Sequence, residues 1–252
     1  MLLFDLDGTL LTSSGIISST TTAIIKLCQL KGYYTGVITA RSRSKKNIRL
    51  LNNLAFDFMA FYNGAKICIK NYLLESNVLP YNQAIMILQK LNIDFPDIIM
   101  DVHMEPWNFS SISGDICHMQ YGNRKKCSLS NLPEYDIQRI RLKSKKLMSI
   151  PLQNYMISES IFYYTNKGDA IIVHKNANKG HATKKAAEFF KIPLTQMIAF
   201  GDDINDIDMI KIVGTGVAMG NSTPSLKKIA NYVTETNENN GIATWINKYL
   251  LQ

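Results

Sequence analysis

The chain opens with a short apolar run that ends in two aspartates and a glycine, Met1-Leu2-Leu3-Phe4-Asp5-Leu6-Asp7-Gly8-Thr9-Leu10. Met1–Leu6 is typical of a buried strand, and Gly8 lets the chain turn away directly after it. Asp5 and Asp7 stand two residues apart, so their side chains point to the same side where the strand finishes. An ordinary acidic turn is one interpretation. The other is chemical, because paired acids suit a nucleophile with a general acid, or ligation of a hard metal ion.

Outward from this stretch, short apolar runs alternate with helical patterns in both terminal parts of the chain. The expected strands are Met1–Leu6, Tyr34–Thr39, Phe56–Tyr62, Met197–Phe200, Val217–Met219 and Tyr232–Thr234. The expected helices are Ser18–Leu30, Ser42–Leu51, Asn178–Phe190, Asp203–Ile210, Thr223–Ala230 and Gly241–Leu250. This order predicts an α/β fold, with a doubly wound, Rossmann-like parallel sheet covered by helices on both faces.

The middle of the chain has a different pattern. A helix is expected at Tyr81–Leu91 and an extended run at Ile98–Met104, followed by a loop-rich stretch that contains Pro106, Gly114 and Gly122. Ser160–Thr165 and Ala170–His174 suggest a hairpin. We therefore expect a second α+β domain over residues 78–175, inserted into a first domain made of residues 1–77 and 176–252.

One strand of the inserted domain is strongly basic. Ile137–Lys145 alternates with period two, and its cations share one face, namely Arg139, Arg141, Lys143 and Lys145. A second group of cations follows the strand at Tyr34–Thr39, consisting of Arg41, Arg43, Lys45, Lys46 and Arg49. We expect most of this second group to form a solvated helix face. Arg41 stands nearest the strand end and is the one candidate for a substrate contact.

The composition is that of a globular protein. The chain has 252 residues, a net charge of +8 and 46% hydrophobic residues, which excludes collagen, coiled coils and disulfide-rich miniproteins. The 22 lysines far outnumber the 6 arginines, whereas proteins that recognise bases in the DNA grooves depend on arginine.

No cysteine spacing indicates zinc, and no apolar run suits a signal peptide or a membrane span. We expect a cytoplasmic monomer or weak homo-oligomer without nucleic-acid or membrane partners.

Three further motifs follow predicted strands or open predicted helices. Gly201-Asp202-Asp203-Ile204-Asn205-Asp206 places three acids and an asparagine in six positions. Helix caps account for one or two of these residues, whereas the whole cluster calls for a cation. Thr39 ends a strand before a helix, where a hydroxyl and backbone N–H groups suit an oxyanion, although a helix cap is the alternative. Lys179 opens a helix, a place unfavourable for a cation unless a phosphate or nearby carboxylates lie beside it.

Together, Asp5 with Asp7, Thr39, Lys179 and the run from Gly201 to Asp206 resemble, in order and spacing, the four motifs of the haloacid dehalogenase superfamily of phosphatases. The resemblance extends to the Cof-type subfamily, since the inserted domain is similar to its large cap. It implies that Asp5 attacks phosphorus to form an aspartyl-phosphate and that Asp7 serves as general acid and then general base.

The resemblance also implies the remaining site. A Mg²⁺ cofactor would be held by Asp5, the backbone carbonyl of Asp7 and Asp202, while Asp206 would act on its surrounding waters. The phosphoryl oxygens would be held by further residues, namely Thr39, Ala40 with its amide, Lys179 and Asn205. The implied substrate is a small phosphorylated metabolite, such as a sugar phosphate or a cofactor phosphate.

Two other functions remain open at this stage. A sugar phosphomutase of the same superfamily would reuse the aspartyl-phosphate instead of hydrolysing it. A phosphate-binding or nucleic-acid-binding regulator would use the positive charge without catalysis. Asp203 departs from the family pattern, because many relatives have glycine or another small residue at this position.

Overall fold

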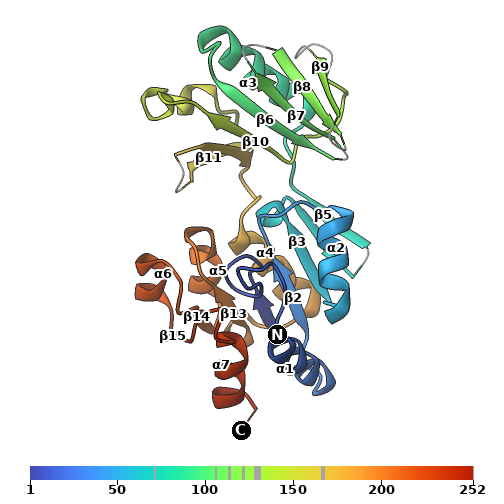
Figure 1. Ribbon diagram of the computed structural model, residues 1–252, viewed down its shortest axis with the longest axis vertical. Helices are drawn as coiled ribbons and strands as arrows, with labels where there is room; N and C mark the ends of the chain where they lie inside the picture. The colour runs from blue at the N-terminus through green and yellow to red at the C-terminus, as the bar shows by residue number, and fades with distance from the viewer. Residues whose placement is uncertain are drawn as a thin grey trace. The chain divides into compact units, whose positions relative to one another are not determined.

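The computed structural model describes residues 1–70, 72–105, 107–112, 115–120, 123–127, 132–165 and 168–251. The chain divides into two compact units, the larger formed by Met1–Ser76 with Ala177–Gln252 and the smaller by Asn77–Asn176 (Figure 1). The sequence analysis expects the first domain to cover residues 1–77 and 176–252. Each of the two boundaries of the larger unit differs from that expectation by one residue.

The larger unit is built on an eight-stranded sheet in the order β15-β14-β13-β1-β2-β3-β4-β5. Neighbouring strands from β15 to β3 run parallel, whereas β4 and β5 extend the β3 edge in antiparallel fashion. The strands span Leu2–Phe4 (β1), Thr35–Ile38 (β2), Phe58–Phe61 (β3), Lys66–Ile69 (β4), Tyr72–Ser76 (β5), Ile198–Gly201 (β13), Thr215–Ala218 (β14) and Tyr232–Val233 (β15). This arrangement confirms the expected doubly wound α/β class.

Strand β1 holds the central place in this sheet. It lies between β2 and β13, with Leu3 opposite Gly36 on one side and Ala199 on the other. The chain proceeds from β1 through β2 to one edge and later from β13 through β15 to the other. The strand order therefore reverses at β1, and ligands of open α/β sheets bind beyond the carboxyl ends of the strands at such a point.

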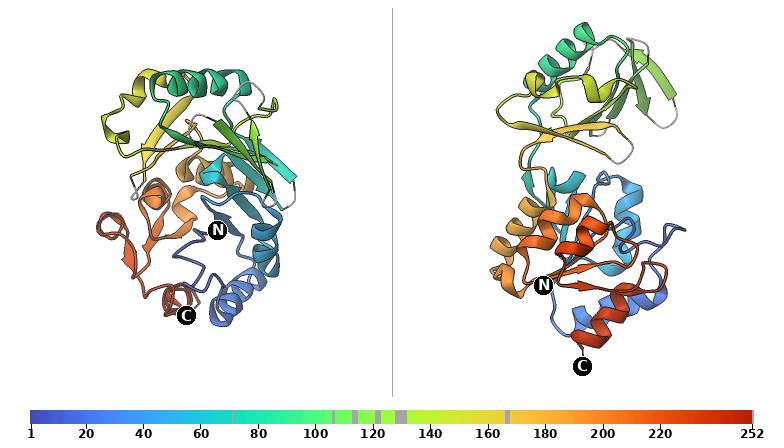
Figure 2. Two further views of the ribbon diagram at one scale, coloured as in Figure 1. Left: turned by 45° about the horizontal axis from the view of Figure 1, so that its top comes forward. Right: turned by 90° about the vertical axis from the view of Figure 1, so that its left-hand side faces the viewer.

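Helices cover both faces of the sheet. They span Ser19–Leu30 (α1), Lys45–Leu51 (α2), Lys179–Phe190 (α4), Ile207–Ile212 (α5), Pro224–Ile229 (α6) and Gly241–Tyr249 (α7). Helices α4, α5 and α6 share one apolar core with Leu3 of β1. On the opposite face, Phe4 stacks on Phe200, and Trp245 of α7 packs edge-on against Phe200. Helix α1 packs against α7, and the two lie side by side in Figures 1 and 2.

Local capping explains where two elements depart from the expected bounds. Helix α2 starts at Lys45 instead of residue 42, because the Ser44 side chain accepts a hydrogen bond from the Asn47 backbone N–H and caps the helix. The helix expected at 203–210 is divided into a 3-10 turn, η7, and α5. The other 3-10 turns are Asn52–Leu54 (η1), Tyr62–Gly64 (η2), Leu147–Ser149 (η4), Leu152–Tyr155 (η5) and Leu194–Gln196 (η6), and η7 spans Ile204–Asp206.

The smaller unit is an antiparallel sheet in the order β11-β12-β10-β6-β7-β8-β9. Its strands span Ile99–Met104 (β6), Trp107–Ile112 (β7), Asp115–Gln120 (β8), Asn123–Cys127 (β9), Arg139–Lys143 (β10), Ser160–Tyr164 (β11) and Ala170–His174 (β12). Helix α3 (Tyr81–Asp94) covers one face of this sheet (Figure 2). Its Leu88 and Leu91 join a core with Val102 and Ile140. An α+β unit is therefore present as expected from the sequence.

The expected loop-rich stretch after Met104 is wrong. The backbone there forms a meander of three strands, β7, β8 and β9. The residues that suggested loops, Pro106, Gly114 and Gly122, lie outside the described residues, as do Asn166 and Lys167 of the expected hairpin between β11 and β12. Strands of five or six residues with little apolar periodicity give a weak signal, so the glycines and the proline dominate the sequence pattern.

The basic strand alternates as expected, but two of its four cations, Arg141 and Lys143, are paired with acids. Ile140 and Leu142 of β10 are fully buried, whereas Arg141 and Lys143 are half-buried on the other face. Arg141 forms an ion pair with Asp169, and Lys143 forms one with Asp101. Because both pairs lie within this unit, the face attracts anions less than the sequence alone indicates.

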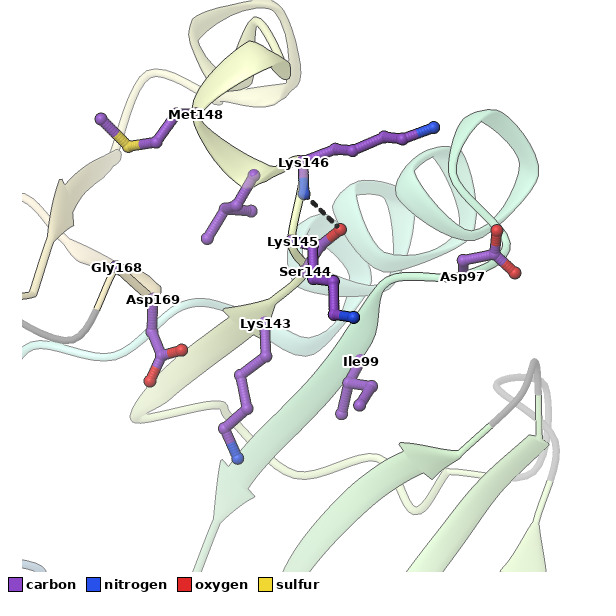
Figure 3. Close-up of a pocket in the computed structure, with 10 residues that line it drawn as sticks. Asp97, Ile99, Lys143, Ser144, Lys145, Lys146, Met148, Gly168 and Asp169 are labelled. Carbon is purple, nitrogen blue, oxygen red and sulfur yellow. Dashed lines mark hydrogen bonds between the residues drawn. The ribbon is translucent and has the colours of Figure 1, made fainter.

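A hollow of about 760 Å³ lies at one end of the smaller unit's sheet, and Lys143, Lys146 and Asp169 stand in its wall (Figure 3). Figure 3 shows the Lys146 side chain extending away from Asp169. Lys143 and Asp169 are already engaged in the ion pairs described above. The charged groups therefore do not converge on one point.

We expect Leu3→Ala to lower the free energy of unfolding of the larger unit by about 2–5 kcal/mol, because it removes a buried side chain from the central strand. Leu30→Ala, at a side chain 85% exposed, serves as the control and should change stability by less than about 0.5 kcal/mol. Urea unfolding followed by Trp245 fluorescence in a Trp107→Phe background makes the measurement. Equal losses in both variants would contradict the core described here.

Candidate active site

Polar side chains follow three neighbouring parallel strands of the larger unit. Asp5 comes directly after β1, Thr39 after β2 and Asp202 after β13. The Asp5 N–H donates to the Phe200 carbonyl at 3.0 Å, and the Thr39 N–H donates to the Ala60 carbonyl at 2.9 Å. Backbone hydrogen bonds between strands thus bring these residues to one edge of the sheet, at the point where the strand order reverses.

A buried lysine joins two of the acids. The ammonium group of Lys179, the first residue of α4, donates to Asp5 Oδ1 and, at 2.5 Å, to Asp206 Oδ1. The Lys179 and Asp206 side chains have no exposed surface. Burial by itself lowers the pKa of Lys179, but the charges of Asp206 and Asp5 outweigh burial and raise it above its ordinary value. The carboxylates of Asp5 and Asp206 therefore offset the unfavourable interaction between the Lys179 ammonium group and the positive N-terminal end of α4.

Asp206 also shapes the turn that carries Asp202. Its second oxygen, Oδ2, accepts hydrogen bonds from the backbone N–H groups of Asp202 at 2.9 Å and Asp203 at 3.0 Å. A Cβ at Gly201 would stand 2.6 Å from the Asp206 side chain, so only glycine fits there. Both oxygens of Asp206 are thus engaged, and this residue orients the turn rather than offering an open ligand position.

Asp202 meets the turn that follows β1. Its Oδ1 accepts a hydrogen bond from the Thr9 hydroxyl at 2.9 Å. A Cβ at Gly8 would lie 2.3 Å from Asp202 Oδ2, and the φ of Gly8 is +77°, so the close approach and the backbone conformation both require glycine. Burial, followed by the charge of Asp206, raises the pKa of Asp202 to about 6.

Asp5 and Asp202, with Asp206 as their support, fit a hard divalent cation. One carboxylate oxygen from each of Asp5, Asp202 and Asp206 lies within 4.8 Å of the other two. Burial raises the pKa of Asp5 well above its ordinary value, and Lys179 offsets only part of this effect. Because three carboxylates face one lysine, the cluster keeps an excess of negative charge away from bulk water, and oxygen donors of this kind are preferred by Mg²⁺ and Ca²⁺.

The other predicted site residues have different partners. Asp7 accepts two hydrogen bonds from the Arg41 guanidinium, from Nε at 2.8 Å and Nη2 at 2.5 Å. The buried Thr39 hydroxyl accepts from the Arg41 backbone N–H at 3.1 Å. Ala40, half-buried, stands between these two residues. Asn205 donates through Nδ2 to Asn63 Oδ1 at 3.1 Å, so its amide reaches the end of β3 rather than the carboxylates.

Sequence reasoning missed several residues of this region. Thr9 supports Asp202, and Asn221 donates to the Gly8 carbonyl at 2.8 Å. Asn63 has a positive φ of 58°, a conformation that asparagine adopts more readily than most residues. The Asn63-Gly64 pair marks a turn in the sequence. Nothing local, however, indicates that Asn63 meets Asn205.

A model of the haloacid dehalogenase-like hydrolase family matches residues 2–246. The chain belongs to this family. It is 27% identical to "Putative phosphatase YkrA" of Bacillus subtilis (strain 168) over 96% of this chain and 95% of that protein. It is 26% identical to "5-amino-6-(5-phospho-D-ribitylamino)uracil phosphatase YitU" of the same organism, over 99% and 97%. The expected enzyme class, a phosphoric monoester hydrolase of the Cof-type, is confirmed.

Solved structures of the family share the fold. A haloacid dehalogenase-like hydrolase from Bacteroides thetaiotaomicron has a TM-score of 0.78 at 22% identity, covering 98% of each chain. TM0651 from Thermotoga maritima has a TM-score of 0.81 at 19% identity, covering 98% of this chain and 96% of that one. Within the described part of this chain, every helix is too short or too polar to cross a bilayer.

We expect Lys179→Met to lower the free energy of unfolding by about 3–5 kcal/mol, since it leaves two buried carboxylates without their cation. Lys185→Met on the same helix breaks more exposed ion pairs, with Glu75 and Glu188, and should lower stability far less, because water screens exposed pairs. Urea unfolding of both variants at pH 7 provides the comparison. Equal losses of unfolding free energy in the two variants would contradict a larger contribution of the buried ion pairs to stability.

The raised pKa of Asp202 predicts a pH dependence in metal-free protein. Between pH 3.8 and about 6, the folded state keeps a proton that the unfolded chain has released. The stability contributed by this group therefore falls as the pH rises through that window and is lowest above it. Unfolding of wild type and Asp202→Asn in EDTA should show their stability difference changing in this window and constant at higher pH. Parallel curves throughout would contradict the shift.

Proposed function

We propose that the protein is a Mg²⁺-dependent phosphatase that hydrolyses a small phosphorylated metabolite through an aspartyl-phosphate on Asp5. The observation that carries this proposal is the buried Asp5 carboxylate, held through one oxygen by Lys179 at the carboxyl end of the central strand. Among the described residues no hydrogen bond engages its second oxygen, Oδ2. The family of the chain and its relatives named as phosphatases support the same reaction.

The first half-reaction transfers the phosphoryl group to the protein. Asp5 Oδ2 attacks phosphorus, an O–P bond forms, and the bond from phosphorus to the leaving oxygen breaks. Asp7 donates a proton to that oxygen as it departs. In the second half-reaction Asp7 accepts a proton from water and the water oxygen forms a bond to phosphorus. The bond from phosphorus to Asp5 Oδ2 breaks, which releases the Asp5 carboxylate and inorganic phosphate.

A bound Mg²⁺ would be held by Asp5, the backbone carbonyl of Asp7 and Asp202. It would supply positive charge that offsets the carboxylates and the phosphoryl oxygens. Asp206 contributes indirectly, because it fixes the backbone of Asp202 through two hydrogen bonds. Its own oxygens are engaged by Lys179 and by backbone N–H groups, which favours a supporting role beside the ion.

The phosphoryl oxygens have a set of proposed donors beside Asp5. An ammonium group has three N–H bonds, and Lys179 uses two of them on Asp5 and Asp206, which leaves one for a phosphoryl oxygen. The Thr39 hydroxyl accepts from the Arg41 amide and keeps its own proton to donate. The Ala40 amide and the second Nδ2 proton of Asn205, whose first proton is donated to Asn63, complete the proposed set. Such donors act mainly by positioning and by stabilising charge in the transition state.

The inserted unit, Asn77–Asn176, is proposed to select the substrate, because the motif residues all belong to the larger unit and recognise only the phosphoryl group. One relative is named for a phosphorylated ribitylaminouracil, which favours a sugar phosphate or cofactor phosphate as the substrate class. We do not propose a nucleic-acid partner, since Arg141 and Lys143 of the basic strand are already paired with aspartates.

A panel of phosphorylated metabolites, assayed for inorganic phosphate with and without Mg²⁺, tests the proposal. We expect Mg²⁺-dependent release, abolished by EDTA, and a loss of roughly 10³-fold or more in Asp5→Asn, because the nucleophile is removed. Asp208→Asn, at an exposed acid on α5, is the matched control and should retain activity.

Three outcomes would contradict this proposal. Equal turnover in wild type and Asp5→Asn would exclude Asp5 as nucleophile. Isomerisation of a sugar phosphate without release of phosphate would indicate a phosphomutase. Tight RNA or DNA binding at physiological salt, with no hydrolysis of any phosphate, would favour the binding regulator.

A further inference from the structure

The Arg41 guanidinium is held from two sides. Nε and Nη2 donate to the two oxygens of Asp7, at 2.8 and 2.5 Å. The third nitrogen, Nη1, donates to Asn47 Oδ1 at 3.3 Å. A bidentate pair of this kind constrains direction as well as distance, because the guanidinium plane is rigid. The third contact fixes the plane at its far end, so Asn47 restricts where the Asp7 carboxylate can lie.

Asn47 is itself firmly anchored in the first turn of α2. Its residue is only 8% exposed, and its Nδ2 donates to the Ser42 carbonyl at 2.8 Å. Its backbone N–H donates to Ser44 Oγ at 3.3 Å, the capping contact of the helix. Since Nδ2 must face the Ser42 carbonyl, Oδ1 must face Arg41, and the orientation of the amide is determined by its partners.

Asp7 needs such a support more than the other acids do. Its side chain is 56% exposed, whereas that of Asp5 is 8% exposed and held by Lys179. A half-exposed carboxylate without a partner samples several rotamers, and ordering it costs free energy. Arg41 is suited to hold it, because its backbone N–H bonds to Thr39 Oγ1 and its carbonyl accepts from the Tyr62 N–H at 2.9 Å.

We propose that Asn47 is a positioning residue, which acts through Arg41 to hold the Asp7 carboxyl group where it transfers a proton to the leaving oxygen. The inference rests on the proposed function, in which Asp7 is the general acid. In that step the Asp7 O–H bond breaks, the proton moves to the leaving oxygen, and that oxygen keeps the electron pair of its broken bond to phosphorus. Asp7 is left as a carboxylate, which Arg41 is placed to pair with.

The demand for this proton depends on the leaving group. An alkoxide is a poor leaving group and requires the proton, whereas dinitrophenolate departs without one. A residue that positions Asp7 therefore matters for alkyl phosphates and little for 2,4-dinitrophenyl phosphate. A residue that only stabilises α2 affects both substrates alike. The ratio of the two kcat/KM values consequently separates a positioning role from a structural one.

The test compares Asn47→Ala, Asn47→Asp and Leu51→Ala on β-glycerophosphate and 2,4-dinitrophenyl phosphate. We expect Asn47→Ala to lower kcat/KM about 10-fold or more for the alkyl ester and less than about 3-fold for the aryl ester. Asn47→Asp keeps an oxygen for Arg41 Nη1 but turns its other oxygen toward the Ser42 carbonyl, so it should restore only part of the alkyl-ester rate. Leu51→Ala removes a buried side chain at the other end of α2, where the guanidinium has no hydrogen bond, so it should leave the ratio unchanged.

Equal losses on the two esters in Asn47→Ala would overturn the role of Asn47. Arg41→Lys keeps the positive charge but cannot donate the paired hydrogen bonds of the guanidinium group to Asp7. This variant is a second test and should lower kcat/KM more for the alkyl ester than for the aryl ester. Failure of the proposed function has a different signature. In that case wild type would hydrolyse neither ester in a Mg²⁺-dependent manner, or Asp5→Asn would hydrolyse both as fast as wild type.

Discussion

One buried ammonium group, that of Lys179, compensates two carboxylates at the carboxyl end of the large sheet. Asp5 follows β1, Asp206 closes the turn after β13, and Lys179 opens α4, so three distant segments of the chain meet at a single charge. In a site buried this deeply, each of these ions would be costly alone. The pairs therefore stabilise the fold and also hold the oxygen that we propose as nucleophile.

The surroundings of this contact follow from it. Asp206, fixed by Lys179, accepts from the Asp202 amide, and Gly201 leaves the space for its side chain. Asp202 then meets the turn at Gly8, where a Cβ would overlap its carboxylate. Gly8 and Gly201 therefore allow the side chains of Asp202 and Asp206 to pack closely against the backbone. The packing concentrates negative charge that one lysine does not balance, and this excess is the physical reason to expect a divalent cation.

A second and more exposed network lies beside the first. Asp7, Arg41 and Asn47 are connected by three hydrogen bonds from one guanidinium group. The sequence marks Arg41 as a possible substrate contact within a solvated basic face, and it offers no sign of Asn47. Helix capping explains the difference, because Ser44 starts α2 later than expected and places Asn47 in its first turn. The buried network of Lys179, Asp5 and Asp206 stabilises the fold. The network of Arg41 and Asn47 orients the half-exposed carboxylate of Asp7.

The sequence by itself determined the α/β order, the inserted unit and the chemical types at the strand ends, because periodicity and turn residues act locally. It missed the meander β7–β9, whose short strands carry little periodicity. Only the tertiary structure decided which polar side chains pair with one another. Lys143 meets Asp101, Arg41 meets Asp7 and Asn205 meets Asn63 across 42, 34 and 142 residues of chain. Such partners depend on strand neighbours and on distance in space, which no local pattern encodes.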